Sequence, residues 1–193
     1  MLSRVYHWFY CLPLWTAVFW VILMTAVFLW LREKLRERGF WKWTVGAMLT
    51  AWLALTFYYT LGRRSAGTIQ EIHLIPFYSY YLVRQGGNPE LIRSNLMNVM
   101  LFWPAGLLGA ELLPGSWKSA WRVLLVFTVG ALLGLGIECA QYNWGLGLPE
   151  VDDLIHNSLG ALLGALAGAV PSAMWSKMNA KMRELWSRFT ICF

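Results

Sequence analysis

Apolar residues gather into five long runs along the chain, and most charged residues lie between these runs. The runs cover about residues 12–31, 43–61, 96–113, 121–142 and 154–175. A helix needs roughly 20 apolar residues to cross the hydrocarbon core of a bilayer. The pattern therefore predicts an all-α fold, a polytopic transmembrane helical bundle of about five spans. We expect a single membrane domain over residues 1–193, since the chain shows no low-complexity segment.

The ends of the runs carry residues that are typical of membrane helix termini. Tryptophan favours the membrane interface, and the tryptophans near the predicted ends are Trp8, Trp30, Trp41, Trp43, Trp117, Trp144 and Trp175. Asn88-Pro89-Glu90 predicts the start of the third helix, with the asparagine as its N-cap. Gly145 predicts the end of the fourth helix, because glycine readily takes the left-handed conformation that closes many helices.

Composition and charge favour a membrane location and argue against a nucleic-acid-binding surface. Hydrophobic residues make up 58% of the chain and charged residues 13%, whereas soluble domains usually carry about 25% charged residues. The net charge of +6 comes from basic residues between the apolar runs, where Lys and Arg set topology. With five spans, one set of connections holds 11 of the 16 basic residues. We therefore expect the N-terminus outside and the C-terminus in the cytoplasm.

Two segments outside the predicted spans are also apolar. Residues 174–193 predict a cytoplasmic amphipathic tail, since one helical face holds Met174, Met178, Met182, Leu185 and Phe189. Such a helix lies in the membrane interface. The loop segment 70–77 ends in Pro76 and Phe77. It dips into the membrane interface, covers the pocket, or packs as a short strand or turn.

Polar residues inside the predicted spans share helix faces with glycines. Residues three or four positions apart lie on one face of a helix. In the fourth helix such a face holds Gly130, Gly134, Glu138 and Gln141. In the fifth helix it holds Asp153, Asn157, Gly160, Gly164 and Gly168. Glycines at this spacing let membrane helices approach closely, so we expect these two helices to pack as an antiparallel hairpin.

The same spacing brings polar residues of three helices to similar depths. With a rise of about 1.5 Å per residue, Glu138 lies about 10 Å below the outer end of its helix. Asn157 lies at a similar depth on the next helix, and Asn95 and Asn98 share a face of the third. We therefore predict an outward-opening polar pocket lined by Asn98, Glu138, Gln141, Asp153 and Asn157, with Asn95 in support.

The acidic residues of the fourth and fifth helices have both functional and structural interpretations. An ionisable residue inside a span is costly and is a candidate for function, and Glu138 is the strongest one. Its alternative role is a structural carboxyl that hydrogen-bonds Asn157 or Asn98. Asp152 and Asp153 lie in the first turn of the fifth helix, where an acid also stabilises the exposed N–H groups. We expect Asp152 to be such a cap, and Asp153 fits either role.

Metal and nucleophilic chemistry receive little support from the sequence. His156 follows the two aspartates at helical spacing and could form a nitrogen and oxygen site with Glu138 and Asp152. No HExxH or HxxEH pattern accompanies it. Ser158 has no evident general base. We expect neither a metal centre nor a cofactor.

Three stretches of the chain carry a family resemblance when they are taken together and in order. They are Ile75-Pro76-Phe77, then Asn95-Leu96-Met97-Asn98 with Leu101-Phe102-Trp103-Pro104-Ala105-Gly106-Leu107, then Glu138-Cys139-Ala140-Gln141 with Asp152-Asp153-Leu154-Ile155-His156-Asn157-Ser158-Leu159-Gly160. They resemble the VanZ-like family, named for a protein associated with teicoplanin resistance, over about residues 69–168. The resemblance implies a multi-pass protein of the bacterial cytoplasmic membrane that is linked to glycopeptide resistance, without a settled mechanism.

The chain departs from this family at two places. Many relatives carry an arginine in the loop between the glutamine and the aspartates, whereas residues 145–150 hold none. An anionic ligand group would then bind differently or recruit Arg84 or Arg93. His156 replaces a residue that is commonly apolar in relatives, which further weakens the metal interpretation.

Three functions are open on these grounds. The first is a non-enzymatic envelope protein that binds a lipid-linked cell-wall precursor or a lipoglycopeptide near the outer leaflet. The second is an intramembrane enzyme that modifies an envelope lipid, with Glu138 as general acid or base beside Asp153. The third is a small transporter or a partner subunit, although no inverted repeat is visible in the sequence.

Overall fold

The computed structural model describes residues 14–65, 67, 72–169, 174 and 181. Within these residues the chain forms six α-helices and one short π-helix, and it contains no β-strand. The π-helix η1 (Tyr58–Gly62) continues α3, and the α-helices are α2 (Leu14–Leu35), α3 (Trp41–Phe57), α4 (Tyr78–Arg84), α5 (Glu90–Leu112), α6 (Ser119–Trp144) and α7 (Val151–Ala169). The all-α fold class is confirmed. Most of the predicted tail, residues 174–193, lies outside the described residues.

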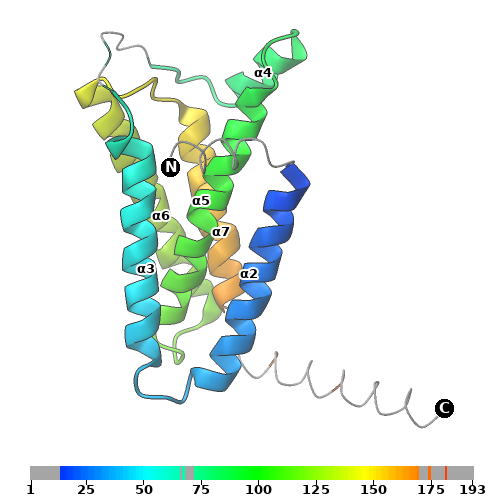
Figure 1. Ribbon diagram of the computed structural model, residues 1–193, viewed down its shortest axis with the longest axis vertical. Helices are drawn as coiled ribbons and strands as arrows, with labels where there is room; N and C mark the ends of the chain where they lie inside the picture. Colours follow the sequence, from blue (N-terminus) through cyan, green and yellow to red (C-terminus); the bar gives the residue numbers. More distant parts are fainter. Residues whose placement is uncertain (1–13, 66, 68–71, 170–173, 175–180, 182–193) are drawn as a thin grey trace, which may run out of the picture.

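The long helices α2, α3, α5, α6 and α7 run along the long axis of the bundle, and the short α4 lies at one end (Figure 1). The connections α2–α3 and α5–α6 lie at the opposite end from α4 (Figure 1). We call this the Glu111 end, after a buried residue described below. The loop between α6 and α7 lies at the same end as α4, which we call the α4 end (Figure 1).

Two helical stretches are long and apolar enough to cross a membrane, among the described residues and by length and composition alone. They are Trp41–Gly62, with 22 residues, and Ser119–Trp144, with 26 residues. α2 also presents apolar side chains outward, since Phe19, Ile22 and Met24 are each more than half exposed. Exposed apolar side chains along a whole helix suit contact with lipid. Five crossings and the orientation of the termini stay predictions.

α7 packs closely against α5 through its glycine face. A Cβ atom at Gly160 would overlap the carbonyl oxygen of Val99, and one at Gly164 would overlap that of Trp103. Gly168 continues the row toward the Glu111 end. Small residues at this spacing allow two helix backbones to come this close. The backbone of α5 therefore fills the space that side chains on α7 would otherwise occupy.

α6 meets a neighbouring face of α7 through glycines of its own. A Cβ atom at Gly130 would overlap Cβ of Ala161, and one at Gly134 would lie 3.2 Å from Cβ of Asn157. The two helices run side by side and are joined by a short loop (Figure 1). Gly145 closes α6 in the left-handed conformation, with φ of 60°, as its position in the sequence predicts. α7 thus lies between α5 and α6.

A buried ion pair at the Glu111 end, formed by Glu111 and Arg32, joins four helices. Glu111 of α5 is 2% exposed, and it accepts a hydrogen bond from Nε1 of Trp41 in α3 at 3.0 Å. Its second oxygen lies 3.5 Å from Nη1 of Arg32 in α2. The same guanidinium nitrogen donates to the carbonyl oxygen of Gly168 in α7 at 3.2 Å. A charge pair with these further partners fixes the relative positions of the helix ends.

Candidate functional site

The polar residues predicted inside the spans lie on three neighbouring helices toward the α4 end. Four of them are buried, and Asn98 and Asp153 are half-buried. The helices α5, α6 and α7 each supply two. We call the set the polar cluster: Asn95, Asn98, Glu138, Gln141, Asp153 and Asn157.

Contacts between helices bring members of the polar cluster together. Asn157 of α7 lies against Gly134, one turn of α6 before Glu138. The carboxylates of Glu138 and Asp153 are close enough to repel each other. Asn98 of α5 lies beside the carboxylate of Asp153. Its amide nitrogen does not reach hydrogen-bond geometry with a described residue.

The loop between α6 and α7 covers one oxygen of Glu138. Oε2 of Glu138 accepts a hydrogen bond from the backbone N–H of Glu150 at 3.1 Å. The sequence interpretation offered Asn157 or Asn98 as structural partners, whereas this bond runs to the loop backbone. The chain segment that begins α7 is therefore tied to the carboxylate of α6.

Gln141 connects the polar cluster to the π-helix. Its Nε2 donates to the carbonyl oxygen of Thr60 in η1 at 3.2 Å. π-helical turns are rare and are frequent at functional sites. No spacing rule in the sequence marks Tyr58–Gly62 as π-helical, so this partner could not be predicted.

Four amide atoms of the polar cluster are buried without a hydrogen-bond partner among the described residues. They are Nδ2 of Asn95, Nδ2 of Asn98, Oε1 of Gln141 and Oδ1 of Asn157. Most buried polar atoms in proteins form a hydrogen bond with another protein group or an ordered water. A buried polar atom without such a bond lowers the stability of the fold by about 1–3 kcal/mol. The cluster therefore holds two donors and two acceptors that a polar ligand group or water can satisfy.

Arg64 places a positive charge beside the two carboxylates. Its guanidinium lies over Gly147 in the α6–α7 loop, where a Cβ atom would overlap Nη1. The charge of Arg64 attracts both Glu138 and Asp153. A glycine at position 147 therefore leaves room for an arginine that comes from another part of the chain.

The arginine beside this loop differs from the two that the sequence suggested. The sequence leaves two alternatives, that an anionic group binds differently or that it recruits Arg84 or Arg93. Arg93 instead lies 3.6 Å from Glu90, one helical turn away in α5. Arg64 comes from the connection that follows η1, which approaches the loop where the N–H of Gly67 donates to the carbonyl oxygen of Gly145 at 2.6 Å.

The apolar segment before α4 lies along the start of α7. The backbone N–H of His73 donates to the carbonyl oxygen of Pro149 at 3.0 Å, and its carbonyl oxygen accepts from Val151 at 2.9 Å. Leu74, Ile75 and Phe77 are 71%, 63% and 56% exposed. The segment is thus fixed by its backbone and presents apolar side chains outward, while Pro76 stays exposed within it.

Asp152 anchors the beginning of α4. Its carboxylate accepts hydrogen bonds from the backbone N–H of Phe77, from the N–H of Ser79 at 2.9 Å, and from the Ser79 hydroxyl. Phe77 has a positive φ of 59°, which is uncommon for a residue with a side chain. The aspartate therefore caps a different helix from the one on which it lies.

Replacing Asp152 by alanine is expected to loosen residues 72–84 and to lower the stability of the protein by about 1–3 kcal/mol, because buried donors lose their acceptor. Hydrogen–deuterium exchange measures this directly. Exchange should rise at Phe77 and Ser79 and stay unchanged in the middle of α6. Unchanged exchange across residues 72–84 would show that the carboxylate does not hold this segment.

His156 and Ser158 are engaged by neighbouring protein groups. The ring of His156 stacks on Tyr80 with centroids 5.8 Å apart, and its Nε2 lies 2.8 Å from the Tyr80 hydroxyl. Nδ1 lies against the carbonyl oxygen of Asp152 in the preceding turn. The Ser158 hydroxyl donates to Leu154 at 2.7 Å. No group of three potential metal ligands occurs in the described part of the chain.

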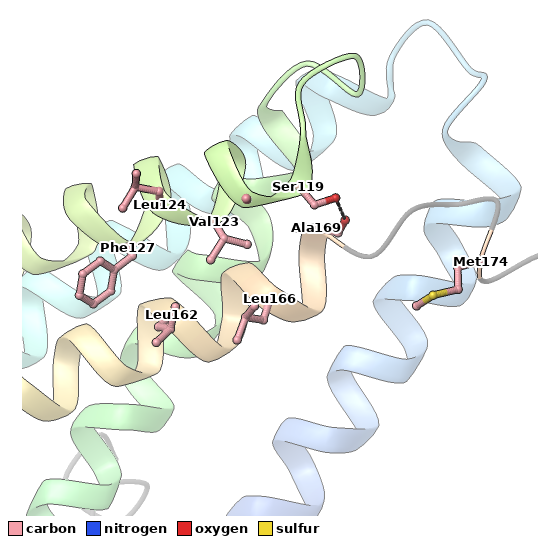
Figure 2. Close-up of a pocket in the computed structure, with 9 residues that line it drawn as sticks. Ser119, Val123, Leu124, Phe127, Leu162, Leu166, Ala169 and Met174 are labelled. Atoms are coloured by element: carbon pink, nitrogen blue, oxygen red, sulfur yellow. Dashed lines mark hydrogen bonds between the residues drawn. The ribbon is translucent and has the colours of Figure 1, made fainter.

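Open hollows lie along α6 at a distance from the polar cluster. A groove of about 530 Å³ lies between α6 and α7 near the Glu111 end, and Figure 2 shows the residues that line it. Its lining is almost entirely apolar and consists of Ser119, Ala120, Val123, Leu124, Phe127, Leu162, Leu166, Ala169 and Met174. An opening from the polar cluster to the outside therefore stays a prediction.

Comparison with known proteins identifies the family. The family model described as VanZ/LLP1 matches residues 40–170. This range contains all six members of the polar cluster, Arg64 and Glu111, and it begins earlier than the region 69–168 on which the sequence resemblance rests. No curated protein and no solved structure matches the chain. Because the match covers more than half of its residues, the chain belongs to the VanZ/LLP1 family.

Proposed function

We propose that this chain is a five-span protein of the bacterial cytoplasmic membrane that contributes to resistance against teicoplanin-type glycopeptides. It binds an envelope lipid, such as a lipid-linked cell-wall precursor, or the lipoglycopeptide itself at the outer leaflet. The observation that carries this proposal is the polar cluster, in which four side-chain amide atoms are buried without a hydrogen-bond partner among the described residues. Polar groups inside a membrane bundle are costly and commonly mark function.

The charges around the polar cluster suit a ligand headgroup. Glu138 and Asp153 supply acceptors, and Arg64 supplies an exposed cation on the loop side. Asn95 and Asn98 add amide donors. A headgroup with both donors and acceptors would meet complementary partners here, which gives binding specificity.

The exposed apolar segment before α4 suits the lipid part of the same ligand. Leu74, Ile75 and Phe77 lie on the segment whose backbone joins the α6–α7 loop. Exposed apolar side chains beside a polar site fit a molecule with an acyl chain and a polar headgroup. In the proposed orientation the α4 end faces outward, where both envelope precursors and glycopeptides are found.

Growth inhibition by teicoplanin in a sensitive Gram-positive host tests this proposal. We expect the wild-type protein to raise the inhibitory concentration, and Glu138→Gln, Asp153→Asn and Asn157→Ala to lose most of this protection. Glu90→Gln is the matched control, because Glu90 is an exposed acid in the first turn of α5, and α5 begins at the same end of the bundle (Figure 1). All variants are compared at equal membrane levels.

The outcomes of this assay separate the family role from the site. Absence of protection by the wild type would contradict the resistance role of this chain. Equal protection by the wild type and by the three cluster variants would show that the polar cluster is structural. Loss of protection in Glu90→Gln as well would point to a general effect of charge at the α4 end.

One observation favours an enzyme as the second candidate. Glu138 and Asp153 are two neighbouring carboxylates in a water-poor environment, which is an arrangement that general acid and base catalysis uses. Such an enzyme would modify an envelope lipid. Lipid extracts from cells with and without the protein should then differ by a new or depleted lipid species, and identical extracts would exclude this candidate.

A further inference from the structure

A second charged cluster lies at the Glu111 end, away from the polar cluster. Besides Arg32, the Nε atom of Arg36 lies 3.9 Å from Glu111. Nζ of Lys42 donates to the backbone carbonyl oxygen of Glu111 and lies 3.4 Å from that of Leu113. The guanidinium of Arg122 donates to the carbonyl oxygen of Ala110. We call these residues the basic cluster: Arg32, Arg36, Lys42, Arg122 and Glu111.

Among the described residues, the basic cluster has an excess of positive charge for a partly buried site. Within this part of the chain four cations act on the carboxylate of Glu111, and Arg36 repels Arg32, Lys42 and Arg122. The exposed acid Glu33 adds only a weak attraction to Arg32. Like charges gathered in a low dielectric are unfavourable unless an anion compensates them. The charge balance of this cluster therefore favours the binding of an anion.

Two buried arginines of the basic cluster have guanidinium nitrogens without a hydrogen-bond partner among the described residues. Nε and Nη2 of Arg32 and Nε of Arg122 are buried without a hydrogen-bond partner in the described part of the chain. Arg32 is 1% exposed and Arg122 is 5% exposed. Guanidinium groups bind phosphate through several charge-assisted hydrogen bonds. Three unused donors on two buried arginines thus fit a tetrahedral oxyanion better than a single carboxylate.

The cluster is reachable from the surface on one side. The Arg36 side chain is 34% exposed, and Lys42 is exposed at the start of α3. Arg36 belongs to the connection between α2 and α3, and Lys42 lies in the first turn of α3. This connection lies at the end of the bundle (Figure 1). Basic residues at the end of membrane helices meet the phosphate groups of lipids.

The apolar groove of Figure 2 begins next to this cluster. Ser119, which lines the groove, donates to the carbonyl oxygen of Ala169 at 3.2 Å. Arg32 of the basic cluster donates to the preceding carbonyl, that of Gly168. The charged site and the apolar groove therefore meet at the last turn of α7. A phosphate joined to an acyl chain can occupy both, whereas free phosphate uses only the first.

We propose that the basic cluster binds the phosphate group of a membrane phospholipid whose acyl chain lies in the groove between α6 and α7. Arg32 and Arg122 donate to the phosphate from inside the bundle. Arg36 and Lys42 hold it on the exposed side. The bound lipid ties α2 and α3 to α6, and this role is separate from ligand binding at the polar cluster.

Thermal unfolding of the full-length, delipidated protein in detergent tests the proposal with three additives. They are phosphatidylglycerol, diacylglycerol with the same acyl chains, and inorganic phosphate. A ligand that binds the folded state raises the unfolding temperature. We expect a concentration-dependent rise with phosphatidylglycerol and none with diacylglycerol. An equal rise with diacylglycerol would overturn the phosphate site. A rise with phosphate that equals the rise with phosphatidylglycerol would support the phosphate site and overturn a lipid as its source.

Charge-removing variants locate the binding site. Arg122→Gln and Arg36→Gln should each weaken the apparent affinity for phosphatidylglycerol at least tenfold. Lys34 is a charged residue at the same end of α2 but outside the cluster, and its Nζ lies 4.2 Å from the ring centroid of Trp30. The control variant Lys34→Gln should therefore leave the affinity for phosphatidylglycerol unchanged. Arg36 is partly exposed, so its variant keeps the test valid if Arg122→Gln does not fold. Equal affinity in all folded variants would refute the site.

Discussion

Replacing Glu111 by alanine is expected to destabilise the protein by about 3–5 kcal/mol, because it leaves the buried charge of Arg32 without its partner. The loss also removes the acceptor for Nε1 of Trp41. Glu111 belongs to α5, while its partners come from α2 and α3. We therefore expect the helix ends at the Glu111 end to separate first. Thermal or denaturant unfolding of the purified protein measures the effect.

Two comparison variants sharpen the Glu111 prediction. Glu111→Gln keeps the size of the side chain and an acceptor for Trp41, so it should destabilise the protein less than alanine does. Glu90→Ala removes an exposed acid whose pair with Arg93 spans one turn of α5. Such surface pairs contribute about 0–1 kcal/mol. Similar stability losses for Glu111→Ala and Glu90→Ala would mean that the buried pair contributes no more than a surface pair.

Replacing Gly164 by alanine is expected to force α5 and α7 apart. The added Cβ atom would overlap the carbonyl oxygen of Trp103 and lie 2.8 Å from the backbone nitrogen of Leu107. Both are backbone atoms, which cannot rotate away as a side chain can. Overpacking of this kind costs about 1–3 kcal/mol, occasionally more. The amount of folded protein in the membrane and its unfolding temperature should both fall.

Gly136 provides the matched control for this substitution. It lies in the same bundle, on α6, and a Cβ atom there meets no other atom within 4 Å. Gly136→Ala should stabilise α6 by roughly 0.5–1 kcal/mol, because alanine favours helix more than glycine does. Opposite signs for the two variants would support the close contact of α5 and α7. Equal effects would contradict it.

The helices and the inward face of α6 follow from the sequence in a direct way. Apolar runs near the length of a membrane span predict five long helices, and each run lies largely within one helix of the structure. The helical repeat places Gly134, Glu138 and Gln141 on one face of α6, and all three are buried. Periodicity is informative here because a side chain's direction along a helix depends only on local geometry.

The partners of those side chains do not follow from the sequence. Arg64 reaches Gly147 from a connection more than 80 positions earlier, and the packing of η1 against α6 brings that connection to the loop. The same holds for the bond of Gln141 to Thr60. Asp152 fits a helix cap by position, yet it binds the start of α4. Local patterns identify polar residues but not the segment that approaches them.

The basic cluster was detectable in part. Glu111 is the acid inside the third apolar run, and an ionisable residue at such a position indicates a partner or a function. The basic residues before the second run were interpreted as topology signals alone. The burial of Arg32 against Glu111 depends on how α2 packs on α5, which the repeat of apolar residues does not determine.

Binding of fluorescently labelled teicoplanin to the purified protein in lipid nanodiscs tests the role of the polar cluster most directly. We predict saturable binding by the wild type and by Glu90→Gln, and at least tenfold weaker binding by Glu138→Gln, which corresponds to about 1.4 kcal/mol or more. A lipid-linked cell-wall precursor is titrated in parallel. Equal binding by all three folded proteins, or no binding of either ligand by the wild type, would contradict the polar cluster as a ligand site.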